Sequence, residues 1–277
     1  MILIAALLAP VPLATARAAM AAPLPLQAAK KIKDDPEVDK LLKQLKGAMR
    51  DRRGTLDAQG SSALTALIGK FDKLNQKQQR KIVKDTSLVF RATRKPAQAM
   101  LFLAAAEALS RFGDKGAEAL MKQADNGKFK GKEWRQLRKA LILLLGRPAL
   151  PKHAKFLIDI AVQDPDELAR AAAGEALGSY AKYDQKLRKE IVKKLAIELN
   201  AIFNMKNSGQ LGDRAPQEAA QTFTAIQGPW MNTLSKLTGQ RQKDPMLWLR
   251  WWNNNKRKNW DKLGYGGSKK GVSRNKK

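Results

Sequence analysis

From about residue 35 onward, apolar residues recur every three or four positions in short segments that Gly, Pro, Asn and Asp separate. No segment shows the strict alternation of apolar and polar residues that is typical of a strand. The pattern therefore predicts an all-α fold, with the residues around 51–62 forming a loop. The predicted helices span about 36–49, 62–72, 76–90, 96–112, 116–124, 133–145, 151–163, 165–181 and 184–203.

Two helix starts carry clear capping signals. Asp35-Pro36-Glu37 combines an N-cap residue, a first-turn proline and a first-turn acid. The run from Asp164 to Glu167 has the elements of a capping box, with Asp164 as the cap, Pro165 in the first helical position and Glu167 three residues on. We expect this second start to be the best defined in the chain.

The predicted helices come in pairs that repeat. Near the end of the first helix of each pair, a leucine follows an alanine, at intervals of 42, 32 and 36 residues. Units of this size bury their apolar faces only by stacking on their neighbours, so the repeat predicts a short α-solenoid. The four leucines are Leu67, Leu109, Leu141 and Leu177.

The segment "DPDELARAAAGEALGSYA" resembles the first helix of a HEAT repeat of the short bacterial type. The residues that carry the match are Arg170, Ala173, Ala176, Leu177 and Gly178. Two weaker copies have Phe102 and Trp134 at the position of the arginine. The resemblance covers about residues 60–205, and it implies a short right-handed, armadillo-like α-solenoid. It indicates little about function, because such scaffolds have many unrelated roles.

The carboxy-terminal segment is similar to the end of some exported bacterial HEAT-repeat proteins. That pattern is "LTGQ", then Asp-Pro, then W-x-x-W-W and a lysine, and no activity is securely attached to it. The matching positions are Leu237 to Gln240, Asp244, Pro245, Trp248, Trp251, Trp252 and Lys256.

A helix over 245–255, with Asp244 as N-cap and Pro245 as its first residue, would be amphipathic. A base-stacking surface needs rings and basic groups on one accessible face, whereas here the two are separated. We therefore interpret the segment as a tryptophan-rich capping helix that covers the end of the repeats, and a ligand or glycan platform and a membrane belt remain open. Lys256 returns to the apolar side, so the packed helix ends near Asn255 or the lysine stem snorkels. The apolar side holds Trp248, Trp251 and Trp252, flanked by Leu247 and Leu249, and the polar side holds Arg250, Asn253, Asn254 and Arg257.

Composition narrows the chemistry. The 53 Lys and Arg against 25 Asp and Glu give a net charge of +28, which attracts nucleic acid, acidic polysaccharide or an anionic membrane surface. The chain has no cysteine, which excludes disulfides and thiol catalysis. His153 is the single histidine, which excludes a multi-histidine metal site, and we interpret it as an exposed or capping residue. No motif indicates catalysis, a cofactor or a metal, so we expect no enzyme activity.

The first residues read as a secretory signal peptide over 1–21, with Ala18 or Ala21 as the last residue before cleavage, and a disordered Ala/Pro-rich tail is the alternative. We expect an exported protein, periplasmic or extracellular. A disordered linker over 22–34, a repeat domain over 35–260 and a basic disordered tail over 261–277 complete the predicted organisation.

The first functional hypothesis is a non-catalytic protein-interaction scaffold. The alternative is a protein that binds a polyanion, either nucleic acid or acidic polysaccharide, through basic helix faces and the tail. The candidate contacts for a polyanion are Lys256, Arg257, Lys258, Lys269, Lys270, Arg274, Lys276 and Lys277.

Overall fold

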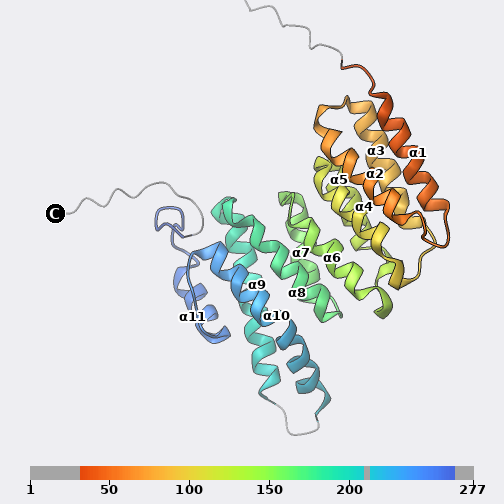
Figure 1. Cartoon of the computed structure of the whole chain (residues 1–277). Coiled ribbons are helices and arrows are strands. Elements are labelled where there is room, and N and C mark those ends of the chain that lie inside the picture. The colour runs from red at the N-terminus through yellow and green to blue at the C-terminus, as the bar shows by residue number, and fades with distance from the viewer. Residues whose placement is uncertain (1–31, 209–212, 266–277) are drawn as a thin grey trace, which may run out of the picture. The chain divides into compact units, whose positions relative to one another are not determined.

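The computed structural model of the chain describes residues 32–208 and 213–265, and within them all regular structure is helical (Figure 1). The predicted all-α class is thus confirmed. The predicted signal peptide over 1–21 and nearly all of the linker lie outside the described residues. The α-helices are α1 (Pro36–Arg50), α2 (Asp57–Lys70), α3 (Gln76–Leu88), α4 (Met100–Arg111), α5 (Gly113–Ala124), α6 (Arg135–Leu145), α7 (Pro151–Gln163), α8 (Glu167–Ala176), α9 (Gln185–Lys206), α10 (Arg214–Thr238) and α11 (Pro245–Asn255).

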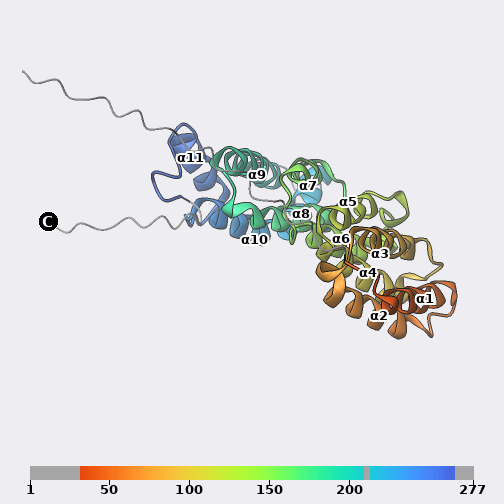
Figure 2. The same ribbon diagram turned by 90° about the horizontal axis from the view of Figure 1, so that it is seen from above.

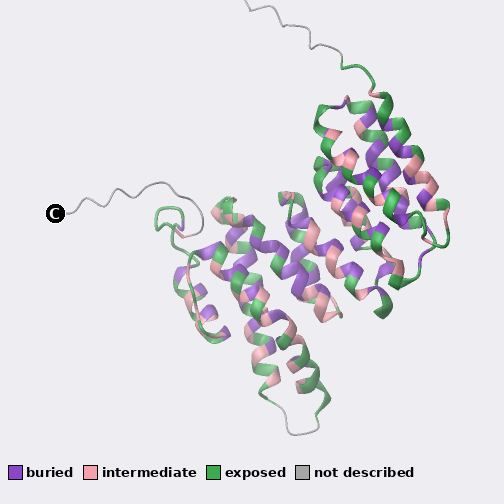
Figure 3. Ribbon diagram, in the orientation of Figure 1, coloured by how far each residue is buried: buried purple, intermediate pink, exposed green. Residues whose placement is uncertain are grey.

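Consecutive even-numbered helices pack against one another in the order α2, α4, α6, α8 and α10 (Figures 1 and 2). On the other side of the core, α3 packs on α5, α7 on α9, and α9 on α11. Each even-numbered helix also contacts an odd-numbered neighbour, as in the pairs α4–α5, α7–α8 and α9–α10. Figure 3 shows the buried residues concentrated between the helices. The repeated leucines, Leu67, Leu109, Leu141 and Leu177, are all fully buried in this core.

The start of α2 corrects the predicted loop over 51–62. The helix begins at Asp57, because the Asp51 side chain holds the preceding turn by accepting hydrogen bonds from Thr55 Oγ1 and the Leu56 N–H, each at 2.9 Å. Gly60 suggests a loop in the sequence, yet it lies within α2. A Cβ there would come within 2.7 Å of the Ala48 Cβ, so the glycine permits close packing between α1 and α2.

The start of α8 differs from the predicted capping box. The N-cap is Asp166, whose side chain accepts a hydrogen bond from the Leu168 N–H at 2.9 Å. Asp164 instead follows the end of α7 and accepts from the Asp166 N–H. A tertiary contact explains the difference: the Arg138 guanidinium of α6 binds the Asp164 carboxylate. The helix also ends earlier than predicted, at Ala176, and continues as a 3₁₀ segment over Leu177–Lys182.

α10 is not among the helices predicted from the sequence, and its packing depends on one close approach. Trp230 is fully buried, and its indole N–H donates to the Arg170 carbonyl at 3.1 Å. A Cβ on Gly174 of α8 would lie 2.0 Å from the indole nitrogen. The glycine therefore leaves the space that the Trp230 ring occupies.

Four largely buried arginines connect successive helix pairs in the same way. Each donates to a carbonyl in the last turn of a helix, where the final carbonyls have no intrahelical partner, and to a carboxylate. A guanidinium suits this position because it has several fixed donors and a positive charge at the negative end of the helix dipole. The sets are Arg94 with Ala48 and Asp57, Arg138 with Ala124 and Asp164, Arg170 with Ala161 and Glu198, and Arg188 with Leu237 and Asp261.

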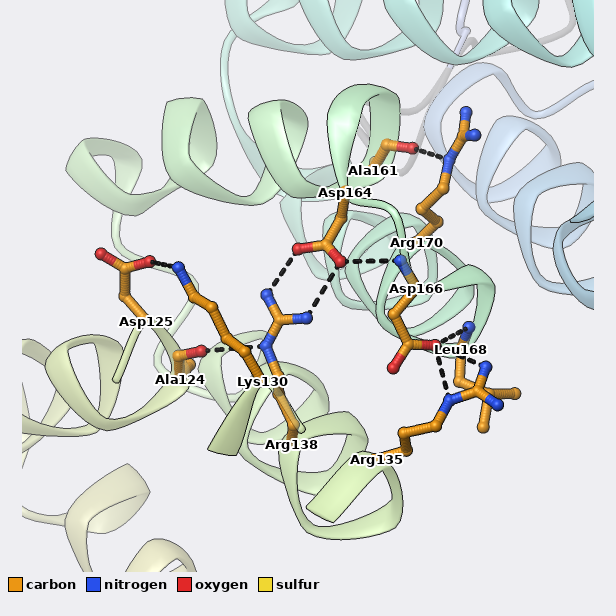
Figure 4. A network of polar contacts seen from close by, with 10 residues as sticks. All are labelled: Ala124, Asp125, Lys130, Arg135, Arg138, Ala161, Asp164, Asp166, Leu168 and Arg170. Atoms are coloured by element: carbon orange, nitrogen blue, oxygen red, sulfur yellow. Dashed lines mark hydrogen bonds and ion pairs between the residues drawn. The ribbon is translucent and has the colours of Figure 1, made fainter. Parts of the chain in front are cut away.

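Figure 4 shows the central part of this arrangement. Arg138 binds the Asp164 carboxylate with both terminal nitrogens, at 2.9 and 2.5 Å, and its Nε donates to the Ala124 carbonyl at 3.3 Å. Arg135 binds Asp166, the residue whose side chain caps α8. Polar contacts therefore join the end of α5, the start of α6, the end of α7 and the start of α8.

His153 corrects the expectation of an exposed or capping residue. Its side chain lies inside the fold, with only 1% of the residue exposed. Neither ring nitrogen has a hydrogen-bond partner among the described residues. Burial lowers the pKa of the imidazole, because the charged form would lose its hydration, so the fold favours the neutral form of His153.

We predict that Asp164→Ala lowers the free energy of unfolding by about 3–5 kcal/mol, because it leaves the buried Arg138 guanidinium without its counter-charge. Urea denaturation measures the change. Asp159→Ala on the exposed side of α7 is the matched control and changes stability little. A loss in Asp164→Ala no larger than the control's would contradict the role given to this ion pair.

His153 predicts a specific pH dependence. The unfolded histidine takes up a proton below about pH 6.5, whereas the buried one resists it, so the stability present above pH 6.5 is lost as the pH falls. The loss continues as the pH falls from 6.5 toward the lowered pKa of the folded histidine, and pH 7.5 and 5.5 lie on either side of the start of this window. Urea denaturation of the wild type and of His153→Met at both pH values measures it. An equal loss in the variant would show that other groups cause it.

Candidate functional site

The tryptophan-rich helix α11 packs on α9. Trp248 is fully buried, Trp252 is nearly so, and Trp251 is half-buried. Asp244 is the N-cap, accepting a hydrogen bond from the Leu247 N–H at 2.8 Å, and Pro245 is the first helical residue. The polar residues of the opposite side, Arg250, Asn253, Asn254 and Arg257, are exposed.

Asn255 ends α11 and organises the turn that follows. It is buried, and its side-chain amide donates to the Trp251 carbonyl at 2.7 Å. Its main-chain carbonyl accepts from the Lys258 N–H at 3.1 Å and from the indole of Trp260 at 2.9 Å. Its side-chain oxygen accepts from the Lys258 ammonium at 3.0 Å. The backbone of residues 256–260 is thereby fixed to the end of the helix.

Trp260 anchors the same turn from its other end. The ring is fully buried, with its centroid 5.3 Å from that of Trp251 and 6.1 Å from that of Trp252. Its main-chain N–H donates to Gln185 Oε1 at 3.0 Å, at the start of α9. An aromatic cluster of four rings, completed by Tyr265, therefore seals the junction of α9 and α11.

Arg188 is the buried group beneath this cluster. Its guanidinium lies 5.9 Å from the Trp260 ring and donates to the carbonyls of Tyr183 and Leu237, at 3.0 and 3.2 Å. It also binds the Asp261 carboxylate and the Tyr265 carbonyl. Asp261 and Tyr265, which follow the predicted repeat domain, therefore contact the buried end of α9.

Around this anchored turn lies the basic cluster, which we define as Lys189, Lys256, Arg257, Lys258 and Lys262. Four of the five residues are exposed, and Lys189 is partly exposed. The Lys189 ammonium donates to the Lys258 carbonyl at 2.7 Å, which places α9 beside the turn. Within the part of the chain that the structure describes, no member forms an ion pair with a carboxylate, and Asp261 is taken by Arg188. The cluster is thus a concentrated and unneutralised positive charge.

The structure brings together three of the eight residues predicted to contact a polyanion, namely Lys256, Arg257 and Lys258. The other five, Lys269, Lys270, Arg274, Lys276 and Lys277, lie outside the described residues. Sequence reasoning missed Lys189 and Lys262, as well as the residues that hold the turn, Arg188, Asn255 and Trp260. Arg188 stands among lysines in "DQKLRKEIVKK", where a solvated face is the ordinary interpretation.

The residues that the structure describes contain no group of three or more His, Asp or Glu side chains placed to hold a metal ion. None of their helices combines the length and the apolar character needed to span a membrane. Comparison of the chain with protein-family models, with curated proteins and with solved structures finds no match in any of the three.

We predict that Trp260→Ala lowers the free energy of unfolding by about 3–5 kcal/mol, because it opens a cavity inside the aromatic cluster and removes the anchor of the turn. Denaturant titration followed by far-UV circular dichroism measures the loss. Leu263→Ala, at a residue that is 51% exposed, is the control and has little effect. An unchanged unfolding midpoint for Trp260→Ala would contradict the structural role of this ring.

Proposed function

We propose that the protein is a non-catalytic binding protein whose basic cluster holds an anionic polymer. The observation that carries this proposal is the fixed turn at the end of α11, which presents Lys256, Arg257 and Lys258 beside Lys189 without a neutralising carboxylate. Because the backbone of the turn is already ordered, less conformational entropy is lost on binding. Neutralising several anionic groups also releases their counterions, which favours polyanions over single charges.

The scaffold in this proposal is a short right-handed α-solenoid of HEAT-like helix pairs, which α11 closes at its carboxy-terminal end. The stepwise packing of α2, α4, α6, α8 and α10 supports it. Arg170 supports it as well, since the arginine of the HEAT-like pattern binds the Ala161 carbonyl of the preceding helix and Glu198 of the following one. Export to the periplasm or the cell exterior remains part of the proposal, based on the amino-terminal sequence.

A protein-interaction scaffold is the second candidate, and a different surface favours it. Met100 and Leu103 of α4 are 55% and 41% exposed and lie one turn apart on the same side of the helix. Exposed apolar side chains of this kind are common in surfaces that bind other proteins. The basic cluster has five basic residues around an ordered turn, whereas the apolar surface on α4 has two exposed side chains. Polyanion binding is therefore the function we favour.

Titration with heparin and with duplex DNA at two salt concentrations tests the proposal. We expect binding at low salt that weakens steeply as salt rises. Cations from the salt then compete with the protein for the anionic groups of the polymer, so releasing them becomes less favourable. The triple variant Lys256→Ala, Arg257→Ala, Lys258→Ala should make the negative slope of log K against log salt for duplex DNA shallower by about 2 to 3.

The matched control is the triple variant Lys40→Ala, Lys43→Ala, Arg50→Ala on α1, which removes the same charge from three exposed residues that form no ion pair in the described part of the chain. A chain that ends at Tyr265 separates the contribution of the five basic residues beyond it. Equal effects of the two triple variants would contradict binding by the cluster. Absence of binding at low salt would also contradict it, and would favour the protein-interaction scaffold.

A further inference from the structure

A shallow, open groove with both polar and apolar walls lies between α9 and α11, on the side of α11 away from the buried tryptophans. Its volume is about 430 Å³, and four of its seven lining residues are asparagines, so we call it the asparagine groove. The size suits one or two sugar rings or a short peptide segment. Its lining residues are Asn200, Asn204, Met246, Leu249, Arg250, Asn253 and Asn254.

Helical spacing explains how these residues meet. Asn200 and Asn204 stand one turn apart on α9, so both point to the same side. The α11 residues occupy positions 246, 249, 250, 253 and 254, which form one continuous stripe along that helix. The side of α11 that the sequence places toward solvent is therefore one wall of a groove.

Two amides of the groove are accessible to a ligand. The side chains of Asn204 and Asn254 are exposed and form no hydrogen bond with another described residue. The Oδ1 atom of Asn200 also has no partner among the described residues, but it is buried, so a ligand reaches it only if the side chain moves. Asn253 uses one acceptor, for the Lys256 ammonium at 3.2 Å.

Charge and apolar surface add two further features. Arg250 is the one charged residue in the lining, it is exposed, and it has no ion-pair partner among the described residues. No carboxylate lines the groove. Met246, which is 53% exposed, and Leu249 contribute an apolar strip beside the amides.

We propose that the asparagine groove binds a uronic-acid oligosaccharide. Each sugar hydroxyl donates and accepts, as does each asparagine amide, so neighbouring hydroxyls pair with the amides of Asn204 and Asn254. The uronate carboxylate binds the Arg250 guanidinium in a two-point contact. The C–H face of the sugar ring lies against Met246 and Leu249. Nucleic-acid bases fit less well, because no aromatic ring lines the groove.

This inference rests on the proposed function and deepens it, because it names the anionic polymer as an acidic polysaccharide. The helix α11 carries the groove along its length and the basic cluster at its end. The two sites contribute in different ways, the cluster through charge that salt screens and the groove through hydrogen bonds that salt affects less. That difference makes the two proposals separable by experiment.

Isothermal titration of the wild-type chain with trigalacturonate, in about 1 M NaCl, where the Debye length is about 3 Å, tests the groove alone. We expect binding, and we expect the double variant Asn204→Ala, Asn254→Ala to weaken it about tenfold or more. Arg250→Ala, titrated at about 0.1 M NaCl where an exposed charge pair is less screened, should weaken binding of trigalacturonate more than binding of its methyl ester, because the ester has no carboxylate charge. The control pair is Gln221→Ala, Asn232→Ala, which removes two exposed amides from α10 and leaves the affinity unchanged.

No binding of trigalacturonate to the wild type, or unchanged affinity in the Asn204, Asn254 variant, would overturn the assignment. So would hexaglutamate binding with the same dependence on the two asparagines, since that result assigns the groove to an acidic peptide. The triple variant Lys256→Ala, Arg257→Ala, Lys258→Ala serves as the cross-check. It should reduce salt-sensitive heparin binding and leave trigalacturonate binding in high salt intact, so either site can fail independently of the other.

Discussion

The contact of a largely buried guanidinium with a helix-terminal carbonyl and a carboxylate is the interaction on which the arrangement of the helices depends. Apolar side chains alone bring helices together, but they specify little about how one pair follows the next. Arg94, Arg138, Arg170 and Arg188 each satisfy a carbonyl that the end of a helix leaves open, and each joins segments far apart in the sequence. The carboxylates balance the buried charge, so arginine and acid must be present together.

The last of these contacts links the fold to the candidate site. Arg188 joins the start of α9, the end of α10 and the residues after α11, and it lies under the Trp260 ring. The aromatic cluster covers that buried charge and also fixes the turn that displays the basic cluster. Packing α11 on α9 also forms the asparagine groove, which lies between the two helices and away from the buried tryptophans. The packing of α11 and its following turn on α9 thus produces both proposed binding surfaces.

Much of this could be read from local patterns. The caps Asp35 and Asp244 with their following prolines, and the buried leucines at the repeated positions, follow from rules that act within a few residues. The errors arise where a distant partner changes the meaning of a residue. Gly60 suggests a loop until α1 packs against it, Asp164 suggests a cap until Arg138 binds it, and His153 suggests a surface residue until its neighbours cover it. In each case the deciding atoms are remote in the sequence.

The sequence by itself determined the helical class, the approximate boundaries of most helices other than α10, the amphipathic character of α11 and the strong positive charge. These properties depend on the spacing of apolar residues and on composition, and both can be read from the sequence without knowing the fold. Only the tertiary structure decided which of the many lysines lie without a counter-charge, which amides share a groove and which arginine is buried. Arg188 and Lys189 are adjacent in the chain, yet one supports the core and the other belongs to the basic cluster. Helix rotation and the packing of segments some seventy residues apart set that difference.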